Sequence, residues 1–372
     1  MDFSFSDEQL LLAETVQRFV REQYTFETRR DLLQAHRASN VWAELAGLGL
    51  TAINVPEEHG GLGGTAVDTM LVMNAFGEGL VLEPFIEAAV LTPALIAQMG
   101  GTATELLPAI ATGERIAILA HEEPQSRGTL SSVAATATAA RSGFVVNGHK
   151  SVVGFANRAH DLIVSARLAG DVNDTNSIGV FRIDPHAAGV RVTSYRTLDG
   201  HEAADIELTD VAVSAENCLS QDAFAAIDAA YDVALSALCA EAVGIMKAVN
   251  ASTLEYLKNR KQFGQAIGRF QVLQHRMADM YIYAEQATSM SYLAAIRCTD
   301  SNRTERRKAL SAAKVLVGQA GRFIAQQSIQ LHGGMGMTDE MRVSHYFKRL
   351  TAIEFTLGDT DTHLQRFTAA SA

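Results

Sequence analysis

The chain has few cysteines, few prolines and no excess of basic residues. Its three cysteines, Cys218, Cys239 and Cys298, lie far apart, with no Cys-x-x-Cys pair and no nearby pair of histidines. This spacing argues against a metal site or a disulfide framework, so we expect reduced thiols in a cytoplasmic protein. The formal net charge of -11 leaves no basic stripe for a phosphate backbone, which argues against nucleic acid as a partner.

Long apolar runs are also missing. No stretch approaches the roughly 20 consecutive apolar residues of a membrane-spanning helix, so we expect no membrane association. The first residues, Met1-Asp-Phe-Ser-Phe-Ser-Asp-Glu8, are acidic and lack the apolar centre of a signal peptide. With 372 residues, 48% of them hydrophobic and 20% charged, the chain has the composition of a globular protein of two or three domains.

The spacing of apolar residues divides the chain into three regions, which we expect to be domains at residues 1–114, 115–221 and 222–372. The first region shows helical spacing from Ser6 or Asp7 onwards. The second is rich in Val, Thr and Ala in short alternating runs, typical of a small antiparallel barrel or sandwich. The third has long helical patterns that suit a four-helix-type bundle. The predicted fold is therefore mainly α with a central β domain.

The expected elements can be bounded from the same patterns. The predicted N-terminal helices, after the first, are Val41–Leu50, Met70–Leu82, Phe85–Met99 and the shorter Thr102–Thr112. The predicted strands are Ile116–Ala120, Ser132–Ala139, Phe144–Val146, Leu162–Ala166, Ile178–Ile183 and Asp205–Leu208. The predicted bundle helices are Phe224–Leu257, Phe270–Cys298 and Glu305–Leu331.

Two glycine-containing stretches stand at the ends of long bundle helices. The first reads Leu257-Lys-Asn-Arg-Lys-Gln-Phe-Gly-Gln-Ala-Ile-Gly-Arg-Phe-Gln271 and places Arg260 near a helix end. A guanidinium there complements the helix dipole and can reach a phosphate, although a plain basic helix end is the alternative. The second, Gln330-Leu-His-Gly-Gly-Met-Gly-Met-Thr338, is either a glycine C-cap or a place where backbone approaches a pyrophosphate.

Together these stretches resemble the signatures of the acyl-CoA dehydrogenases, flavoproteins that desaturate acyl thioesters. The first is similar to Arg-x-x-Phe-Gly-x-x-Ile-x-x-Phe-Gln and the second to Gln-x-x-Gly-Gly-x-Gly, and the resemblance runs from Asp7 to Arg366. It implies an acyl-CoA dehydrogenase-like fold, an acyl-CoA substrate, FAD, and electron-transfer flavoprotein as electron acceptor. It also implies a homo- or hetero-oligomer in which two subunits share each FAD. The residues that it places at the adenosine end of a neighbour's FAD are Arg260, Phe263, Gly264, Phe270, Gln271, Gln330, Gly333 and Gly334.

The half of the family's site that holds the flavin ring is poorly matched. Where the family has Thr-Glu-Pro-x-x-Gly-Ser-Asp, this chain has His121-Glu-Glu-Pro124 and then lacks Ser-Asp. The family's Asn-Gly-x-Lys-x-Trp-Ile-Thr is retained as Asn147-Gly-His-Lys150, but Val152 and Gly154 replace the tryptophan and the threonine. Valine supplies no aromatic platform and glycine no hydroxyl hydrogen bond.

The catalytic base that the resemblance implies is displaced. Many members carry it in Tyr-Glu-Gly-Thr before the final helix, where alternative alignments give Leu357 or Asp359 in this chain. Others carry it on an early bundle helix, at a position that aligns with Ala234; Glu241 lies seven residues later on the same helix face. Glu241 is thus a candidate base. The alternative is a salt bridge to an arginine of the bundle, because a buried carboxylate is costly unless paired.

Two functions fit these observations. In the first, the chain is an FAD-dependent acyl-CoA dehydrogenase that desaturates an acyl-CoA thioester between its α and β carbons, as one subunit of a heteromer. In the second, it is a non-catalytic partner subunit that only completes the FAD site of a different, catalytic chain. The retained adenosine half and the lost ring half resemble the smaller subunits of heteromeric acyl-CoA dehydrogenases. Those enzymes act on steroid side-chain or pimeloyl-type dicarboxylic thioesters.

Overall fold

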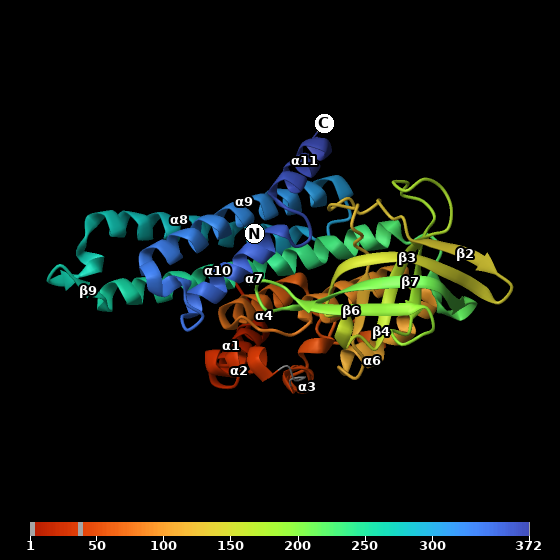
Figure 1. Ribbon diagram of the computed structural model, residues 1–372, viewed down its shortest axis with the longest axis horizontal. Helices are drawn as coiled ribbons and strands as arrows, with labels where there is room; N and C mark the ends of the chain where they lie inside the picture. The colour runs from red at the N-terminus through yellow and green to blue at the C-terminus, as the bar shows by residue number, and fades with distance from the viewer. Residues whose placement is uncertain (1–3, 36–39, 372) are drawn as a thin grey trace. The chain divides into compact units, whose positions relative to one another are not determined.

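The computed structural model describes residues 4–35 and 40–371, which group into two compact units (Figure 1). The first, here called the bundle unit, consists of Met1–Ala38, Ala66–Leu82 and Leu235–Ala372. The second, the sheet unit, consists of Ser39–Thr65 and Glu83–Ala234. Each unit is assembled from segments far apart in the sequence. The three predicted domain ranges are not tested by this division and stay a prediction.

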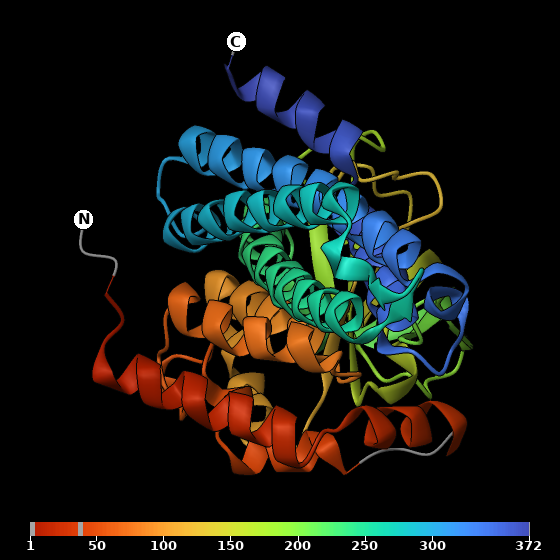
Figure 2. The same ribbon diagram turned by 90° about the vertical axis from the view of Figure 1, so that its left-hand side faces the viewer.

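The bundle unit is helical throughout its long segments. Its helices are α1 (Asp7–Glu22), α2 (Phe26–Ala35), α4 (Ala66–Gly79), α8 (Gln271–Arg297), α9 (Arg303–His332), α10 (Arg342–Phe355) and α11 (Thr360–Ser371), with most of α7 (Phe224–Asn259). Helix α9 packs against α8, α10 and α11, and α1 packs against α4 (Figure 2). The three predicted bundle helices correspond to α7, α8 and α9, so the expected C-terminal helical bundle is confirmed.

Glycines allow α4 and α7 to approach closely inside the bundle unit. A Cβ on Gly77 of α4 would collide with the Glu241 carbonyl oxygen, and one on Gly244 of α7 would collide with the Asn74 carbonyl oxygen. The two contacts are reciprocal, because each helix presents a glycine to the backbone of the other. This crossing fixes the height and rotation of α7, and therefore where the Glu241 side chain lies.

The sheet unit contains one sheet of eight strands. They are β1 (Ala117–Ala120), β2 (Thr136–Ala140), β3 (Gly143–Gly154), β4 (Asp161–Arg167), β5 (Ile178–Ile183), β6 (Val190–Arg196), β7 (Glu202–Ser214) and β8 (Cys218–Ser220). Their order is β6-β7-β3-β2-β4-β5-β8, and β1 pairs with β4. The pairs β1–β4 and β2–β4 are parallel and the others antiparallel. The expected central β region is confirmed.

Two predicted helices of the sheet unit differ from the expectation, and the longer of them is Phe85–Met99. Phe85–Met99 is not one α-helix but a π-helical segment, η3 (Phe85–Leu91), followed by α5 (Thr92–Met99). Pro93 has no N–H to donate to the Ala89 carbonyl one turn earlier, which disrupts the regular ladder. The Asn54 side-chain amide donates to that carbonyl instead, at 3.0 Å.

The remaining short elements of the sheet unit connect these parts. They are α3 (Val41–Gly47), η1 (Leu50–Ala52), η2 (Glu57–His59), η4 (Gly101–Leu106), α6 (Leu107–Ala111), η5 (Ala156–Arg158) and η6 (Ala215–Asn217). The expected helix Thr102–Thr112 is thus divided between a 3₁₀ segment and one short α-helix. Among the described residues, α7 is the helix long and apolar enough to cross a membrane, but 83% of its most apolar stretch is buried. Such burial is typical of a core helix, so this is weak evidence for a membrane span.

Candidate functional site

The two glycine-containing stretches meet at one end of the bundle unit. Tyr256, in the last turn of α7, stacks on His332, the last residue of α9, with ring centroids 4.4 Å apart. The Tyr256 hydroxyl also donates to the His332 carbonyl at 3.3 Å. The contact brings Arg260, just past α7, to the same end as Gly333, just past α9. We call this group of residues, 260–271 and 330–334, the adenosine-end cluster.

A short hairpin forms the outer part of this cluster. Strand β9 (Lys261–Gln262) pairs antiparallel with β10 (Gln265–Ala266), and Phe263 and Gly264 form the two-residue loop. Both loop residues have positive φ, 53° and 77°, as a tight hairpin turn requires. The phenyl ring of Phe263 is 89% exposed and meets that of Phe270 edge to face, with centroids 6.0 Å apart. The hairpin therefore presents an aromatic side chain to the outside of its own subunit.

Cationic and backbone groups for a phosphate lie beside this hairpin. Arg260 is exposed, and no carboxylate of residues 4–35 and 40–371 lies within ion-pairing distance of its guanidinium. Gly333 has a φ of 61°, and neither Gly333 nor Gly334 has an atom within 4 Å of where a Cβ would stand. Gln271 and Gln330 are exposed at the helix ends. An unpaired guanidinium and open glycine backbone are what a pyrophosphate requires, so this cluster fits the phosphate end of FAD.

The motif residues of the sheet unit form a buried polar network. Lys150 is fully buried, and its ammonium donates to Glu123 Oε1 at 2.6 Å, to Ser165 Oγ at 3.1 Å and to the His121 carbonyl at 3.2 Å. Burial opposes ionisation of Glu123, yet the charge of Lys150 and its hydrogen bond hold the pKa of that carboxyl below its usual value. Burial, and then Lys150, lower the pKa of His121 to about 3. These side chains bind each other and link the second half of β3 to β4, through the contact of Lys150 with Ser165.

The ring-side segment, defined here as residues 121–124 and 147–154, departs from what an isoalloxazine requires. Val152 is 62% exposed and has a φ of 52°, a strained conformation for a β-branched residue. Gly154 lies against Glu87 of η3, whose carboxylate fills the space beside its Cα. The flavin ring presents mainly acceptor atoms at its polar edge, and a carboxylate is an acceptor only. Positions 152 and 154 therefore offer neither an aromatic platform nor a hydroxyl donor to the ring, and the side chain nearest Gly154 is an acceptor.

Glu241 lies in the core of the bundle unit in a bidentate ion pair. Its two carboxylate oxygens accept hydrogen bonds from Arg349 of α10, Oε1 from Nε at 2.6 Å and Oε2 from Nη2 at 2.7 Å. Glu241 is 4% exposed and Arg349 is 8% exposed. This is the salt-bridge alternative for Glu241. Its assignment as a base stays a prediction, and it would require the pair to open.

Asp359, the second candidate base, precedes helix α11. Its Oδ1 accepts a hydrogen bond from the Thr362 N–H at 2.8 Å, which is N-cap geometry. Hydrogen bonds from the Thr362 hydroxyl and N–H lower the pKa of Asp359, which weakens it as a base. The preceding turn is held by buried Lys314 of α9, which donates to the carbonyls of Ile353, Glu354 and Thr356. The structure thus brings neither candidate base to the adenosine-end cluster.

Two residues that matter in the structure, Arg349 and Glu87, are not indicated by the sequence pattern. Arg349 was not identified as the partner of Glu241, because two residues 108 positions apart carry no local signal of their contact. Glu87 lies inside the predicted helix Phe85–Met99, where the sequence gives a single glutamate no distinguishing feature. The importance of Glu87 comes from its contact with Gly154, and only the fold brings these two residues together.

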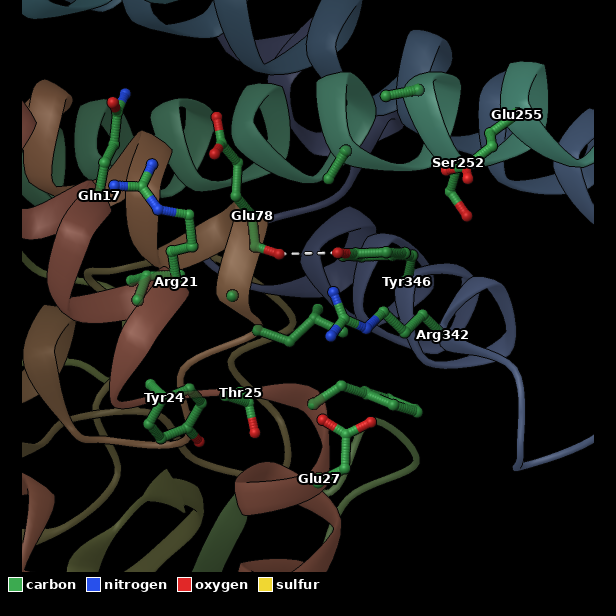
Figure 3. A pocket seen from close by; sticks show the side chains of 16 residues that line it. Gln17, Arg21, Tyr24, Thr25, Glu27, Glu78, Ser252, Glu255, Arg342 and Tyr346 are labelled. Atoms are coloured by element: carbon green, nitrogen blue, oxygen red, sulfur yellow. Dashed lines mark hydrogen bonds between the residues drawn. The ribbon is translucent and has the colours of Figure 1, made fainter.

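A cavity of about 740 Å³ opens elsewhere in the bundle unit, between α1, α2, α4, α7 and α10 (Figure 3). Its charged lining residues are Arg21, Glu27, Glu78, Glu255 and Arg342. The Tyr346 hydroxyl donates to the Glu78 carbonyl oxygen across it, and burial raises the pKa of the Glu78 carboxyl. The cavity contains none of the predicted site residues. No group of three or more metal-ligating side chains is found in the part of the chain that the structure describes.

Comparisons with known proteins agree with the fold. Three family models match in succession: the N-terminal domain of acyl-CoA dehydrogenase at residues 6–114, its middle domain at 119–211 and its C-terminal domain at 224–371. The probable acyl-CoA dehydrogenase YngJ of Bacillus subtilis is 28% identical, with 100% of this chain and 99% of YngJ covered.

Solved structures give the same result. A variant of the steroid ACAD Tcur3481-Tcur3483 has a TM-score of 0.87 and 28% identity, with 98% of both chains covered. Butyryl-CoA dehydrogenase of Megasphaera elsdenii has a TM-score of 0.89 over 100% of both chains, at 21% identity, which supports the fold. Since three models of one family match nearly the whole chain in order, the chain belongs to the acyl-CoA dehydrogenase family.

Proposed function

We propose that the chain is one subunit of a heteromeric FAD-dependent acyl-CoA dehydrogenase and that it completes the FAD site of a different, catalytic chain. One observation carries this proposal: the two halves of the flavin site differ in this chain. The adenosine-end cluster offers an unpaired guanidinium and open glycine backbone, whereas the ring-side segment offers carboxylates. A homo-oligomer needs both halves in each copy, and a heteromer needs only one half from this chain.

The residues of the adenosine-end cluster have separate roles in this proposal. Arg260 pairs with a phosphate, where a charge-assisted hydrogen bond is strong. Gly333 and Gly334 let the backbone approach the pyrophosphate, because no side chain stands between. Phe263 packs against the adenosine or against the neighbouring chain. When bound, FAD supplies the acceptor for the hydride that leaves the β-carbon of the acyl thioester.

Exposed apolar side chains on α8 support assembly with another chain. Val272, Tyr281 and Ile282 are 61%, 62% and 53% exposed, and they follow Phe263 along the same part of the sequence. Large apolar residues that recur on one exposed helix are typical of a protein interface. A second acyl-CoA dehydrogenase chain on this surface would bring its own flavin-ring half to Arg260.

The catalytic base is assigned to the partner chain in this proposal. Glu241 is held by Arg349 and Asp359 caps α11, so each has a structural role in this chain. The substrate is an acyl-CoA thioester, and the 28% identity to a steroid ACAD favours a steroid side-chain thioester. Electron-transfer flavoprotein as acceptor and a cytoplasmic location follow from the resemblance and belong to the same proposal.

The test is to produce the chain alone and together with acyl-CoA dehydrogenase chains encoded beside it. We expect flavin and turnover of acyl-CoA esters in the mixed assembly, with fewer flavins than subunits. The isolated chain should carry little flavin and show no turnover. Full flavin occupancy together with turnover by the isolated chain would refute the proposal.

A further inference from the structure

We infer that Glu87 closes this chain's own ring-side segment to a flavin, and that Glu87 and Gly154 act as a pair. The inference rests on the proposed function, in which the chain contributes only adenosine-end contacts. It identifies Glu87 as the residue of the sheet unit that keeps a flavin ring out of the ring-side segment.

The first observation is the space beside Gly154. A Cβ on this residue would lie 2.9 Å from Glu87 Oε1 and 3.4 Å from Glu87 Cγ. A contact at 2.9 Å is closer than carbon and oxygen atoms approach without a shift. The carboxylate of Glu87 therefore occupies the volume that a side chain at position 154 needs, and a threonine there would have to displace the end of this glutamate side chain.

The second observation is an ion pair that joins the backbone segments on either side of the contact between Glu87 and Gly154. Glu83, four residues earlier, is 1% exposed at its side chain and accepts a hydrogen bond from Arg158 at 2.6 Å. Arg158 lies four residues after Gly154, in η5. This buried ion pair therefore ties the segment just before η3 to the residues just after β3, the two parts of the chain on which Glu87 and Gly154 lie.

The third observation is the use of backbone donors near Val152. The N–H of Val152 donates to Asp205 Oδ1 at 3.0 Å, and the N–H of Ser151 donates to the Glu122 carbonyl at 2.9 Å. Backbone N–H groups could otherwise hold the acceptor edge of an isoalloxazine without any side chain. Because these two N–H groups are already engaged, neither of them replaces the missing hydroxyl.

The fourth observation is charge. Glu87, Glu122 and Asp205 all lie at this segment, while its lysine, Lys150, is buried against Glu123. A flavin ring that accepts electrons gains negative charge, which nearby carboxylates oppose. Space, donors and charge thus all exclude the ring, and Glu87 contributes to both space and charge.

Riboflavin is the probe that tests this inference, because it carries the ring without the adenosine end. We expect quenching of its fluorescence to show no saturable binding to the wild-type chain. The double variant Glu87→Ala with Gly154→Thr frees the volume and restores a hydroxyl. It should bind riboflavin with a Kd at least about tenfold lower than any residual wild-type value, as one buried hydrogen bond and one removed charge allow.

Matched variants separate the effects of the Glu87 volume, the Glu87 charge and the hydroxyl at position 154 on riboflavin binding. Gly154→Thr alone keeps Glu87 and should not increase the affinity for riboflavin. Glu87→Gln with Gly154→Thr keeps the side-chain volume at position 87, so its affinity for riboflavin should rise little. Glu87→Ala with Gly154→Ser is a smaller replacement in case threonine impairs folding. Circular dichroism and thermal unfolding establish that each variant is folded. Saturable riboflavin binding by the wild-type chain, or no gain in riboflavin affinity in either folded double variant that carries Glu87→Ala, overturns the inference.

ADP binding distinguishes failure of the inference from failure of the proposed function. ADP should bind the wild-type chain and all three double variants equally, since positions 87 and 154 lie outside the adenosine-end cluster. Arg260→Ala should weaken ADP binding and leave the riboflavin result unchanged. If ADP binding does not depend on Arg260, the proposed function fails, whatever the riboflavin titrations show.

Discussion

At the scale of single residues, the ion pair between Glu241 and Arg349 shows how a buried charge is tolerated. Both carboxylate oxygens accept a hydrogen bond, and both groups are almost fully buried. Removing one partner of such a pair leaves the other as an uncompensated buried charge. Sequence patterns predicted that Glu241 needs a partner or a catalytic role, because its neighbours are apolar. They could not identify Arg349, which only the fold of α10 against α7 brings near.

Glu241→Gln should therefore destabilise the protein. Loss of one buried partner costs about 3–5 kcal/mol, since the Arg349 guanidinium is left without a counter-charge. Urea unfolding of the variant measures this loss, with Glu255→Gln, an exposed glutamate of the same helix, as the control. An unchanged free energy of unfolding, with turnover of the assembled enzyme lost, would instead identify Glu241 as the base.

Arg260→Ala should weaken retention of FAD in the assembled protein. A charge-assisted hydrogen bond to phosphate contributes about 1.5–3 kcal/mol, so we expect roughly a tenfold to hundredfold rise in Kd. Flavin fluorescence during dilution or ultrafiltration measures it. Lys258→Ala, an exposed cation in the last turn of α7, is the control for general loss of positive charge. Equal flavin affinity in wild type and Arg260→Ala would contradict the assignment.

At the scale of elements, long helices were predictable and exposed strands were not. Helices α7, α8 and α9 have apolar residues over many turns, and their predicted ends lie close to the observed ones. Strand β6 was missed because it is an edge strand with an exposed, polar surface, including Arg191 and Arg196. Edge strands need little apolar alternation, so the pattern that indicates a buried strand is weak there.

The two parts of the candidate site also differ in how well the sequence predicts them. The adenosine-end cluster could be predicted because its glycines and Arg260 are local features of two helix ends. That these ends meet follows only from the contact of Tyr256 with His332. The closure of the ring-side segment could not be predicted, because Glu87 and Gly154 belong to separate elements.

The crossing of α4 and α7 yields a prediction about stability. Gly244→Ala would push a methyl group into the Asn74 carbonyl, and rigid backbone on both sides leaves nowhere for it to go. Overpacking of this kind costs about 1–3 kcal/mol or more. Thermal unfolding measures the change. Gly47→Ala in α3 is the control, because no atom lies within 4 Å of a Cβ there. An unchanged melting temperature in Gly244→Ala would show that the helices can separate without cost.

At the scale of the whole molecule, several histidines are buried as neutral rings. Burial lowers the pKa of His363 to about 4 and that of His121 to about 3. Burial also lowers the pKa of His345, whose Nδ1 must accept from Arg29, since a guanidinium only donates. In each case the unfolded chain binds a proton more readily than the folded protein. Both units therefore lose stability in acid.

The stability of the protein should fall as the pH drops below about 6.5, the usual histidine pKa. A histidine whose pKa falls to about 4 on folding contributes its full stability above pH 6.5. Between pH 7 and pH 5 that single residue lowers the free energy of unfolding by about 2 kcal/mol, because only the unfolded state gains the proton. Urea unfolding at several pH values measures the slope. His363→Gln should flatten it, and an equal slope in this variant would exclude His363 as a contributor.

The hairpin at the end of α7 has a consequence for how the protein is made. Phe263 has 89% of its surface in water, and Val272, Tyr281 and Ile282 are exposed further along the chain. A newly synthesised copy without a partner subunit leaves these side chains exposed to chaperones, to proteases and to the apolar surfaces of other proteins. In the proposed heteromer, its cellular lifetime would depend on the supply of the partner chain. For such an assembly, synthesis of the two chains at matched rates would shorten the time that Phe263 spends exposed to water.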